Sequence, residues 1–221
     1  MVICGVTFVE ACVESPEAAV AAALGGAQRI ELCANLAAGG TSPDSATLAA
    51  CVSQLAIPVF VMVRPRAGDF HYSAAEHAVM LDEIRRAKDA GAHGIVTGAL
   101  RLGGTVDEPL TRALIAAARP LPVTFHRAFD ECGDVEKALE TVIALGATRI
   151  LTSGQATIAP EGAAAIARLV RLAAERIGIL AGGGINGDNV AALVRTSGVR
   201  EVHLSTKDAE KIRQVVQALS R

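Results

Sequence analysis

Residues 146–153 read GATRILTS, and the same lead-in recurs as GGAQRIEL at 25–32, GAHGIVTG at 91–98 and GVREVHLS at 198–205. Each copy starts with a glycine and continues into a short run that contains Ile or Val. A glycine just after a helix adopts a positive φ without steric strain and so ends the helix at little cost. We therefore expect helices to end at Gly26, Gly91, Gly146 and Gly198, and the apolar runs that follow to be strands.

Eight strand-like runs of this kind alternate with Ala- and Leu-rich helical stretches. They cover residues 6–13, 29–33, 57–64, 94–100, 121–128, 149–154, 176–182 and 200–205. Such alternation is typical of parallel βαβ units, and eight units in 221 residues fit a closed (β/α)8 barrel. The sequence thus predicts an α/β fold, a TIM barrel forming a single domain over residues 1–221, with a doubly wound open sheet as the alternative.

The composition indicates a globular protein, since 51% of the residues are hydrophobic and 20% are charged. No uncharged apolar stretch reaches the roughly 18 residues of a membrane span. The start, MVICGVTFVE, lacks the basic region of a secretory signal, so we expect a cytoplasmic protein without membrane association. A net charge of −2, no tryptophan and one tyrosine argue against nucleic acid as a partner. The sequence leaves open whether the chain forms a homo-oligomer.

The cysteines are odd in number and irregular in spacing, which favours reduced thiols over a disulfide framework. Cys12 and Cys33 occupy matching places in the first two expected strands, each two residues after a glutamate. Two thiolates suit Cu(I), whereas Zn²⁺ would require further Glu or His ligands, and buried cysteines also merely fill space. The other three are interpreted as structural: Cys4, Cys51 and Cys132.

Side chains alternate between the two faces of a strand, so Ile30 and Leu32 share one face and Glu31 and Cys33 the other. The apolar face must meet the outer helices, which directs the polar face into the barrel. The same parity sends inward a further set: Glu10, Cys12, Arg64, Thr124, His126, His203 and Ser205. Active sites of this fold lie at the carboxyl ends of the strands, where these groups converge. The alternative is a set of internal ion pairs, such as Arg64 with Glu31.

Four loops after strands add groups suited to a small anionic ligand. The third loop, RPRAGDFHYS, carries Arg66 and Asp69, and arginine is suited to grip carboxylate or phosphate. The fifth adds Arg127 and Asp130. In the seventh, AGGGINGDN contains Gly183 in a position where barrels commonly bind phosphate through backbone N–H groups, and Ser153 in the sixth loop extends that region. Solvated or tight turns are the alternative at each loop.

Several ordered motifs of this chain closely resemble the CutC family, which is named for copper homeostasis. They are RIELCANLAAGGTSP, PVFVMVRPRAGDF, LPVTFHRAFD, RILTSGQ and AGGGINGDN, and the match runs from about residue 10 to about residue 205. The resemblance implies a cytosolic (β/α)8 barrel that binds Cu(I) through two cysteines, which fall here on Cys12 and Cys33. The segment after Ser205 is shorter than the family pattern, so any contribution from that loop stays open.

Two hypotheses for the function follow. The first is a copper homeostasis protein with a copper ion as its ligand, bound by Cys12 and Cys33. The second is a barrel enzyme that performs acid–base chemistry on a small anionic, phosphorylated or polyhydroxy metabolite, with Glu31, His126 and Arg64 in catalysis. Its substrate-binding residues would be Glu10, Arg66, Asp69, Arg127, Asp130, Ser153, Gly183 and His203.

Overall fold

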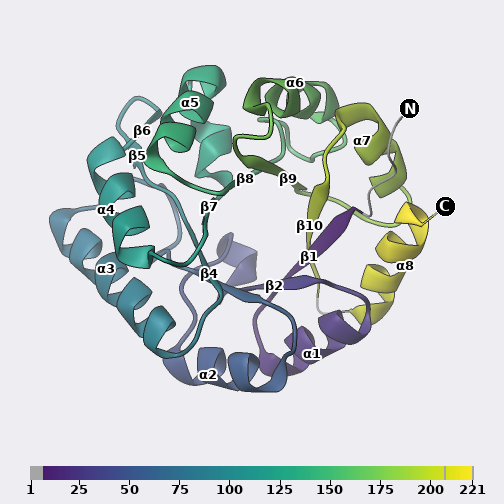
Figure 1. Ribbon diagram of the computed structural model, residues 1–221, viewed down its shortest axis with the longest axis horizontal. Coiled ribbons are helices and arrows are strands. Elements are labelled where there is room, and N and C mark those ends of the chain that lie inside the picture. Colours follow the sequence, from purple (N-terminus) through teal and green to yellow (C-terminus); the bar gives the residue numbers. More distant parts are fainter. Residues whose placement is uncertain (1–6, 207, 221) are drawn as a thin grey trace.

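The computed structural model describes residues 7–206 and 208–220, and within them eight parallel strands close into a barrel (Figure 1). Around the barrel each strand pairs with its neighbours in the order β1-β2-β3-β4-β7-β8-β9-β10, and β10 pairs with β1. The strands are β1 (Phe8–Val13), β2 (Arg29–Leu32), β3 (Val59–Met62), β4 (Gly94–Thr97), β7 (Val123–Phe125), β8 (Arg149–Thr152), β9 (Gly178–Gly182) and β10 (Glu201–Ser205). The predicted (β/α)8 barrel is confirmed.

Eight α-helices in the described part of the chain form a ring outside the strands (Figure 1). They are α1 (Pro16–Leu24), α2 (Ser45–Gln54), α3 (Ala74–Asp89), α4 (Glu108–Ala118), α5 (Val135–Leu145), α6 (Ala163–Ala173), α7 (Val190–Ser197) and α8 (Ala209–Leu219). The four glycines of the repeat all have positive φ, and two of them, Gly146 and Gly198, directly cap α5 and α7. The repeat therefore marks helix ends, as expected.

The loop after β4 differs from the prediction. The run 94–100 was expected as one strand, but β4 ends at Thr97, and Leu100 belongs to a small antiparallel hairpin of β5 (Leu100–Arg101) and β6 (Thr105–Val106). The fifth run, expected over 121–128, is also shorter, because β7 ends at Phe125 and the chain turns into the 3₁₀ helix η2 (Arg127–Glu131). His126 is the N-cap of that helix rather than a strand residue.

Two hydrophobic clusters confirm the predicted alternation of side chains. The larger cluster lies between strands and helices and contains Ile30 and Leu32 of β2 together with the outward residues of the other strands. The smaller cluster lies inside the barrel and consists of Cys12, Cys33, Phe60, Met62 and Val96, with Leu36 packed against it. Each buried aliphatic side chain of the larger cluster stabilises the fold by about 1.5–3 kcal/mol relative to exposure. This core fixes the orientation of every strand and so the position of the inward groups.

Some predictions concern residues outside the described ones, namely the first residue of the expected first strand, Val6, and Cys4. The other cysteines are all free and buried: Cys12, Cys33, Cys51 and Cys132. None of the described helices combines the length and the apolar character needed to cross a membrane.

Candidate functional site

Three neighbouring strands carry the thiol, carboxyl and imidazole groups that lie side by side inside the barrel. β1 supplies Glu10 and Cys12, β2 supplies Glu31 with Cys33 directly after its end, and β10 supplies His203. Because β1 pairs with both β2 and β10, Glu10 lies opposite His203 and Cys12 lies opposite Glu31. All five side chains are buried. The registers thus place two thiols, two carboxyl groups and an imidazole side by side inside the barrel.

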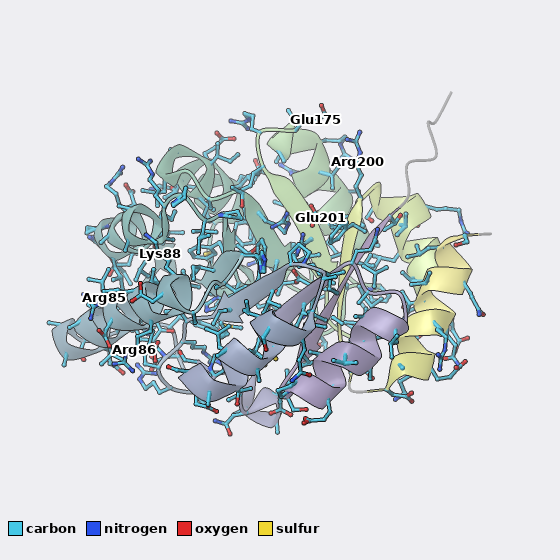
Figure 2. All side chains as sticks on the ribbon, turned by 60° about the horizontal axis from the view of Figure 1, so that its bottom comes forward. Arg85, Arg86, Lys88, Glu175, Arg200 and Glu201 are labelled. Atoms are coloured by element: carbon cyan, nitrogen blue, oxygen red, sulfur yellow. The ribbon has the colours of Figure 1, made fainter. Side chains whose placement is uncertain are left out.

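A network of buried and half-buried ion pairs lies at the amino-terminal ends of these strands. Arg29 donates from Nε to the carboxylate of Glu10, and its NH2 donates to Oε2 of Glu201 at 2.7 Å. Glu201 stands at the start of β10 (Figure 2). Its Oε2 also accepts from Nε of Arg149 at 2.7 Å. The Arg29 guanidinium also lies over the ring of Phe60, 5.0 Å from its centroid. These contacts compensate charges that would be costly to bury alone.

The hydrogen bond between Glu10 and His203 fixes the state of both groups. Nδ1 of His203 lies 2.7 Å from Oε1 of Glu10 and therefore carries a proton, so Nε2 is the nitrogen that can bind a metal ion once the imidazolium has lost its second proton. Burial raises the pKa of Glu10, but the bond to His203 and the charge of Arg29 outweigh burial and lower that pKa to about 2. Burial lowers the pKa of His203, but the charges of Glu31 and Glu10 outweigh it and raise that pKa.

The two thiols lie next to each other. Sγ of Cys12 is 3.4 Å from Sγ of Cys33 and donates to Oε1 of Glu31 at 3.1 Å, while Sγ of Cys33 also lies 3.7 Å from the carbonyl of Val13. The hydrogen bond with Cys33, burial and the charge of Glu31 all raise the pKa of the Cys12 thiol well above its ordinary range. Cys12 is therefore a protonated thiol at neutral pH in the ligand-free protein.

Cys12, Glu31 and His203 form a group in which one ligand atom of each lies within 4.8 Å of the others. Oε2 of Glu31 is buried and has no hydrogen-bond partner among the described residues. Burial raises the pKa of Glu31, and the charge of Glu10 adds to this effect against the opposing charge of His203. An orphaned carboxyl oxygen thus lies beside two thiols and an imidazole, and all of these groups are metal ligands in proteins.

A cavity of about 250 Å³ opens above this group at the carboxyl ends of the strands. It is lined by Cys12, Glu31, Leu36, Gly39, Met62, Arg64, Phe70, His126, Arg127, Leu151, His203 and Ser205. The cavity therefore brings together the three residues predicted for catalysis, which are Glu31, Arg64 and His126, with two predicted for binding, which are Arg127 and His203.

Arg64 is a buried cation held by backbone carbonyl groups. Its NH1 donates to the carbonyls of Gly40 at 2.8 Å and Ala38 at 3.3 Å, and its NH2 donates to that of Gly68 at 2.6 Å. Within residues 7–206 and 208–220, no carboxylate pairs with Arg64. Burial raises the pKa of the neighbouring Tyr72 to about 12, against the charge of Arg64 and its hydrogen bond to that hydroxyl. The alternative ion pair between Arg64 and Glu31 is therefore not formed.

His126 belongs to the cavity lining and carries a buried hydrogen-bond donor. Its Nδ1 accepts the backbone N–H of Ala128 at 3.2 Å, so the neutral ring carries its proton on Nε2, which is buried and without a partner in the described chain. Burial and the charge of Arg64 lower the pKa of His126 to about 3. The ring packs against Phe70 at a centroid distance of 4.9 Å. His126 is therefore neutral at physiological pH and held in one orientation.

The carboxylate of Asp130 binds the backbone N–H groups of the sixth loop, where the sequence suggested an external anion. Its carboxylate accepts the backbone N–H groups of Ser153 and Gln155 at 3.0 and 3.1 Å and the hydroxyl of Thr152. Arg127 closes the arrangement, donating from Nε to Asp130 at 2.8 Å and from NH2 to the Ser153 hydroxyl at 2.7 Å. Asp130 and Ser153 thus anchor the fifth loop to the sixth and lie outside the cavity lining.

The remaining predicted site residues also lie outside the cavity lining. Arg66 and Asp69 pair with each other at 2.9 Å, with side chains 37% and 57% exposed, and Arg66 also binds Glu76 at 2.6 Å. They form the solvated turn that was the alternative for this loop. Gly183 packs under Arg127, so that a Cβ there would lie 3.4 Å from NH1. Glu10 lies one layer below the cavity and contacts it only through His203.

A larger groove of about 700 Å³ lies outside the barrel, between the β5–β6 hairpin and the helices α4 and α5. Its basic lining residues, Arg101, Arg112 and Lys137, are exposed. None of the five orphaned buried polar atoms in the described chain belongs to a residue of its lining. Three of the five belong to residues that line the cavity at the barrel mouth, namely Glu31, Arg64 and His126, and we locate the site there.

The sequence analysis missed three charged interior residues: Arg29, Arg149 and Glu201. Arg29 shares its face of β2 with Glu31, and Glu201 shares its face of β10 with His203, so the alternation rule already placed both inside. Phe70, which packs against Arg64 and His126, lies within the third loop and gives no comparable signal. Its position depends on how that loop folds back over the mouth.

The residues of the thiol group suit a soft metal ion. Two thiols, an imidazole nitrogen and a carboxyl oxygen are within reach, and the thioether of Met62 belongs to the same cluster as both cysteines. A Cβ at Gly40 would lie 3.5 Å from Cε of Met62 and 3.6 Å from Sγ of Cys33, so these two soft groups are neighbours. Thiolate and thioether donors select Cu(I), whereas hard ions prefer sites of oxygen ligands.

Comparison with known proteins identifies the family of this chain. The sequence pattern of the CutC family matches residues 7–208. The human copper homeostasis protein cutC homolog is 49% identical over 200 residues, which are 90% of this chain and 73% of that protein. Family protein CutC of Pasteurella multocida is 48% identical over 199 residues, 90% of this chain and 82% of that protein.

Solved structures agree with this result. The crystal structure of CutC from Streptococcus agalactiae superposes with a TM-score of 0.86 at 33% identity, covering 90% of this chain and 98% of that one. Phosphoribosylanthranilate isomerase from Pyrococcus furiosus superposes with a TM-score of 0.61 at 16% identity over 97% of this chain and 98% of that chain. The second similarity concerns the barrel fold alone.

Proposed function

The chain belongs to the CutC family, and we propose that it serves copper homeostasis by binding Cu(I) through Cys12 and Cys33. The observation that carries this proposal is the 3.4 Å separation of two buried sulfurs beside Glu31 and His203. Binding in the reduced cytosol fits this arrangement, because the metal requires both cysteines as thiolates and disulfides are rare there.

The strand register favours a metal ion over a disulfide as the link between the sulfurs. Cys12 lies opposite Glu31, and Cys33 is two residues further along the neighbouring strand. With strands about 4.8 Å apart and a rise of about 3.3 Å per residue, the two Cα atoms are about 8 Å apart. A disulfide needs Cα atoms closer than about 7 Å, whereas a metal ion adds a bond of about 2.3 Å to each sulfur.

His203, Glu31 and Met62 are the groups that would complete or support the coordination. Glu10 holds Nδ1 of His203 and so directs Nε2 as the available donor, an arrangement common around metal-binding histidines. Glu31 offers its orphaned Oε2. The cavity above gives an ion a path from solvent to the thiols, because Cys12, Glu31 and His203 form part of its lining.

Anaerobic titration of the reduced protein with Cu(I), in competition with a chromophoric Cu(I) chelator, tests the proposal. We expect one tightly bound Cu(I) per chain in the wild type and loss of that site in a Cys12→Ala/Cys33→Ala double variant. The matched control is Cys51→Ala/Cys132→Ala, which removes two buried thiols from outside the barrel interior and should retain the site. Unchanged affinity in the first double variant, with its fold verified by circular dichroism, would remove the proposal.

A further inference from the structure

Three side chains at the cavity form a group that is distinct from the pair of thiols. Cys12, Glu31 and His203 all line the cavity, and one ligand atom of each lies within 4.8 Å of the others. Cys33 belongs neither to this group nor to the cavity lining, although its sulfur is 3.4 Å from that of Cys12. Cys12 therefore takes part in two ligand sets, one of two sulfurs and one of sulfur, oxygen and nitrogen.

The distances within the group suit a tetrahedral zinc ion. Zn²⁺ binds thiolate sulfur at about 2.3 Å and carboxylate oxygen or imidazole nitrogen at about 2.0–2.2 Å, which puts neighbouring ligand atoms about 3.3–3.8 Å apart. Sγ of Cys12 and Oε1 of Glu31 already lie 3.1 Å apart, and a ring nitrogen of His203 is within 4.8 Å of both residues' ligand atoms. Side-chain shifts of about 1 Å therefore bring all three into coordination distance.

The surroundings prepare two of these ligands for a metal ion. Nδ1 of His203 is bound to Oε1 of Glu10 at 2.7 Å, and Glu10 is in turn bound by Arg29. A carboxylate on the far nitrogen of a metal-binding histidine is usual around zinc, because it fixes the ring and its tautomer. Glu31 is 2% exposed, and its Oε2 has no hydrogen-bond partner within the described residues, so this buried oxygen has its lone pairs available.

The charges of the group match a divalent ion. The thiolate of Cys12 and the carboxylate of Glu31 carry two negative charges, which cancel the charge of Zn²⁺ when the imidazole is neutral. Two thiolates already exceed the single charge of Cu(I), and adding the carboxylate of Glu31 would increase that excess. Net charge is costly in a buried site, and the charge of nearby Glu10 is already balanced by Arg29. Glu31 is therefore better matched to a divalent ion than to Cu(I).

We propose that Cys12, Glu31 and His203 form a zinc site with three protein ligands and a fourth position that faces the cavity. All three residues line the cavity of about 250 Å³, so a water molecule or substrate there completes the tetrahedron. Three protein ligands and one exchangeable position are the pattern of catalytic zinc, whereas structural zinc has four protein ligands. Such an ion polarises a bound water molecule or carbonyl group as a Lewis acid. The site goes beyond copper binding and does not use Cys33.

Competition between the reduced, metal-free protein and a chromophoric Zn²⁺ chelator tests the site. We expect one Zn²⁺ per chain, and binding at least about tenfold weaker in Glu31→Gln, which keeps the size of the side chain and removes its charge. Cys33→Ala should retain Zn²⁺ and lose the Cu(I) site, so the two metal sites are told apart in one variant. Glu83→Gln is the matched control, because this half-buried carboxyl group lies on α3, bound to Ser42 and outside the cavity lining.

Cobalt substitution gives a second readout that does not depend on affinity. Co²⁺ in this site should show a sulfur-to-metal charge-transfer band that is lost in Cys12→Ala and kept in Cys33→Ala. Added thiocyanate should change the visible bands of Co²⁺, because it takes the position that faces the cavity. Failure of Cu(I) binding leaves both tests intact.

Four results would overturn the proposal. The first two are no binding of Zn²⁺ by the wild type and equal affinity in Glu31→Gln. The third is loss of Zn²⁺ in Cys33→Ala with its fold verified by circular dichroism, since the pair of thiols would then hold the ion. The fourth is a Co²⁺ spectrum that does not respond to thiocyanate, which would indicate four protein ligands.

Discussion

Replacing His126 by asparagine removes a titrating ring from the barrel mouth while keeping the cap of η2. Asparagine is among the best N-cap residues, and its side-chain oxygen can accept the N–H of Ala128 in place of Nδ1. In the folded wild type, burial and the charge of Arg64 lower the pKa of His126 from 6.5 to about 3. In the unfolded chain the ring has its ordinary pKa and binds a proton as the pH falls below 6.5. Stability from this residue is therefore complete above pH 6.5 and is lost as the pH falls towards 3.

The size of the effect follows from the difference in protonation. Each full unit of pH in this window changes the free energy of unfolding by about 1.4 kcal/mol. The change is smaller just below pH 6.5, because the ring in the unfolded chain is only partly protonated there. Between pH 6.5 and 4.5 the wild type should therefore lose about 2 kcal/mol more than His126→Asn. Carboxyl groups such as Glu10 titrate in both proteins and cancel in the comparison.

Urea denaturation of both proteins at half-unit pH steps measures the difference directly. The m-values should match, which verifies that the substitution does not change the unfolded state. A difference in free energy that stays constant within about 0.5 kcal/mol across the window would refute the assignment of His126 as a buried, neutral donor, since one pH unit alone is worth about 1.4 kcal/mol.

Three further predictions concern the interior of the barrel. Arg29→Met leaves Glu10 buried without its cation and should lower the free energy of unfolding by about 3–5 kcal/mol in urea denaturation; a loss below about 1 kcal/mol would contradict the role of this ion pair. Diamide treatment of the folded protein should leave Cys12 and Cys33 unlinked, as counted by mass spectrometry after alkylation, because their Cα atoms are about 8 Å apart; rapid formation of that disulfide would show the register argument to be wrong. Gly39→Ala should destabilise the fold by about 1–2 kcal/mol more than Gly103→Ala. Both glycines have positive φ, but only at Gly39 would a Cβ approach Arg64, at 3.2 Å from NH1. Equal losses of stability in thermal denaturation would argue against this contact.

The alternation rule explains most of what the sequence predicted correctly. Glu31, Cys33 and His203 lie inside the barrel because the residues beside them in the chain are apolar and pack against helices. The same rule, applied two residues earlier in each strand, would also have placed Arg29 and Glu201 inside. Strand parity is a local property, so it can be read without knowledge of the loops.

The loops are where prediction from the sequence failed. Arg64 and Arg66 look equivalent in the chain, yet Arg64 is enclosed by carbonyls from two loops and Arg66 pairs with Asp69 in solvent. Whether each arginine is buried or exposed depends on how residues 34–41 fold back over the barrel mouth, and that folding is a tertiary property. Asp130 likewise looked like a ligand-binding acid, but it satisfies the N–H groups of the sixth loop, over twenty residues away. The sequence alone does not show whether such backbone N–H groups are occupied by an acidic side chain of the protein or by an external anion.

X-ray absorption at the copper edge of the Cu(I)-loaded protein tests the central claim most directly. The thiol pair predicts two sulfur ligands at about 2.3 Å, the length typical of a metal–thiolate bond, and their loss in Cys12→Ala/Cys33→Ala. A first coordination shell made of nitrogen and oxygen alone in the wild type, or an unchanged spectrum in the double variant, would contradict it.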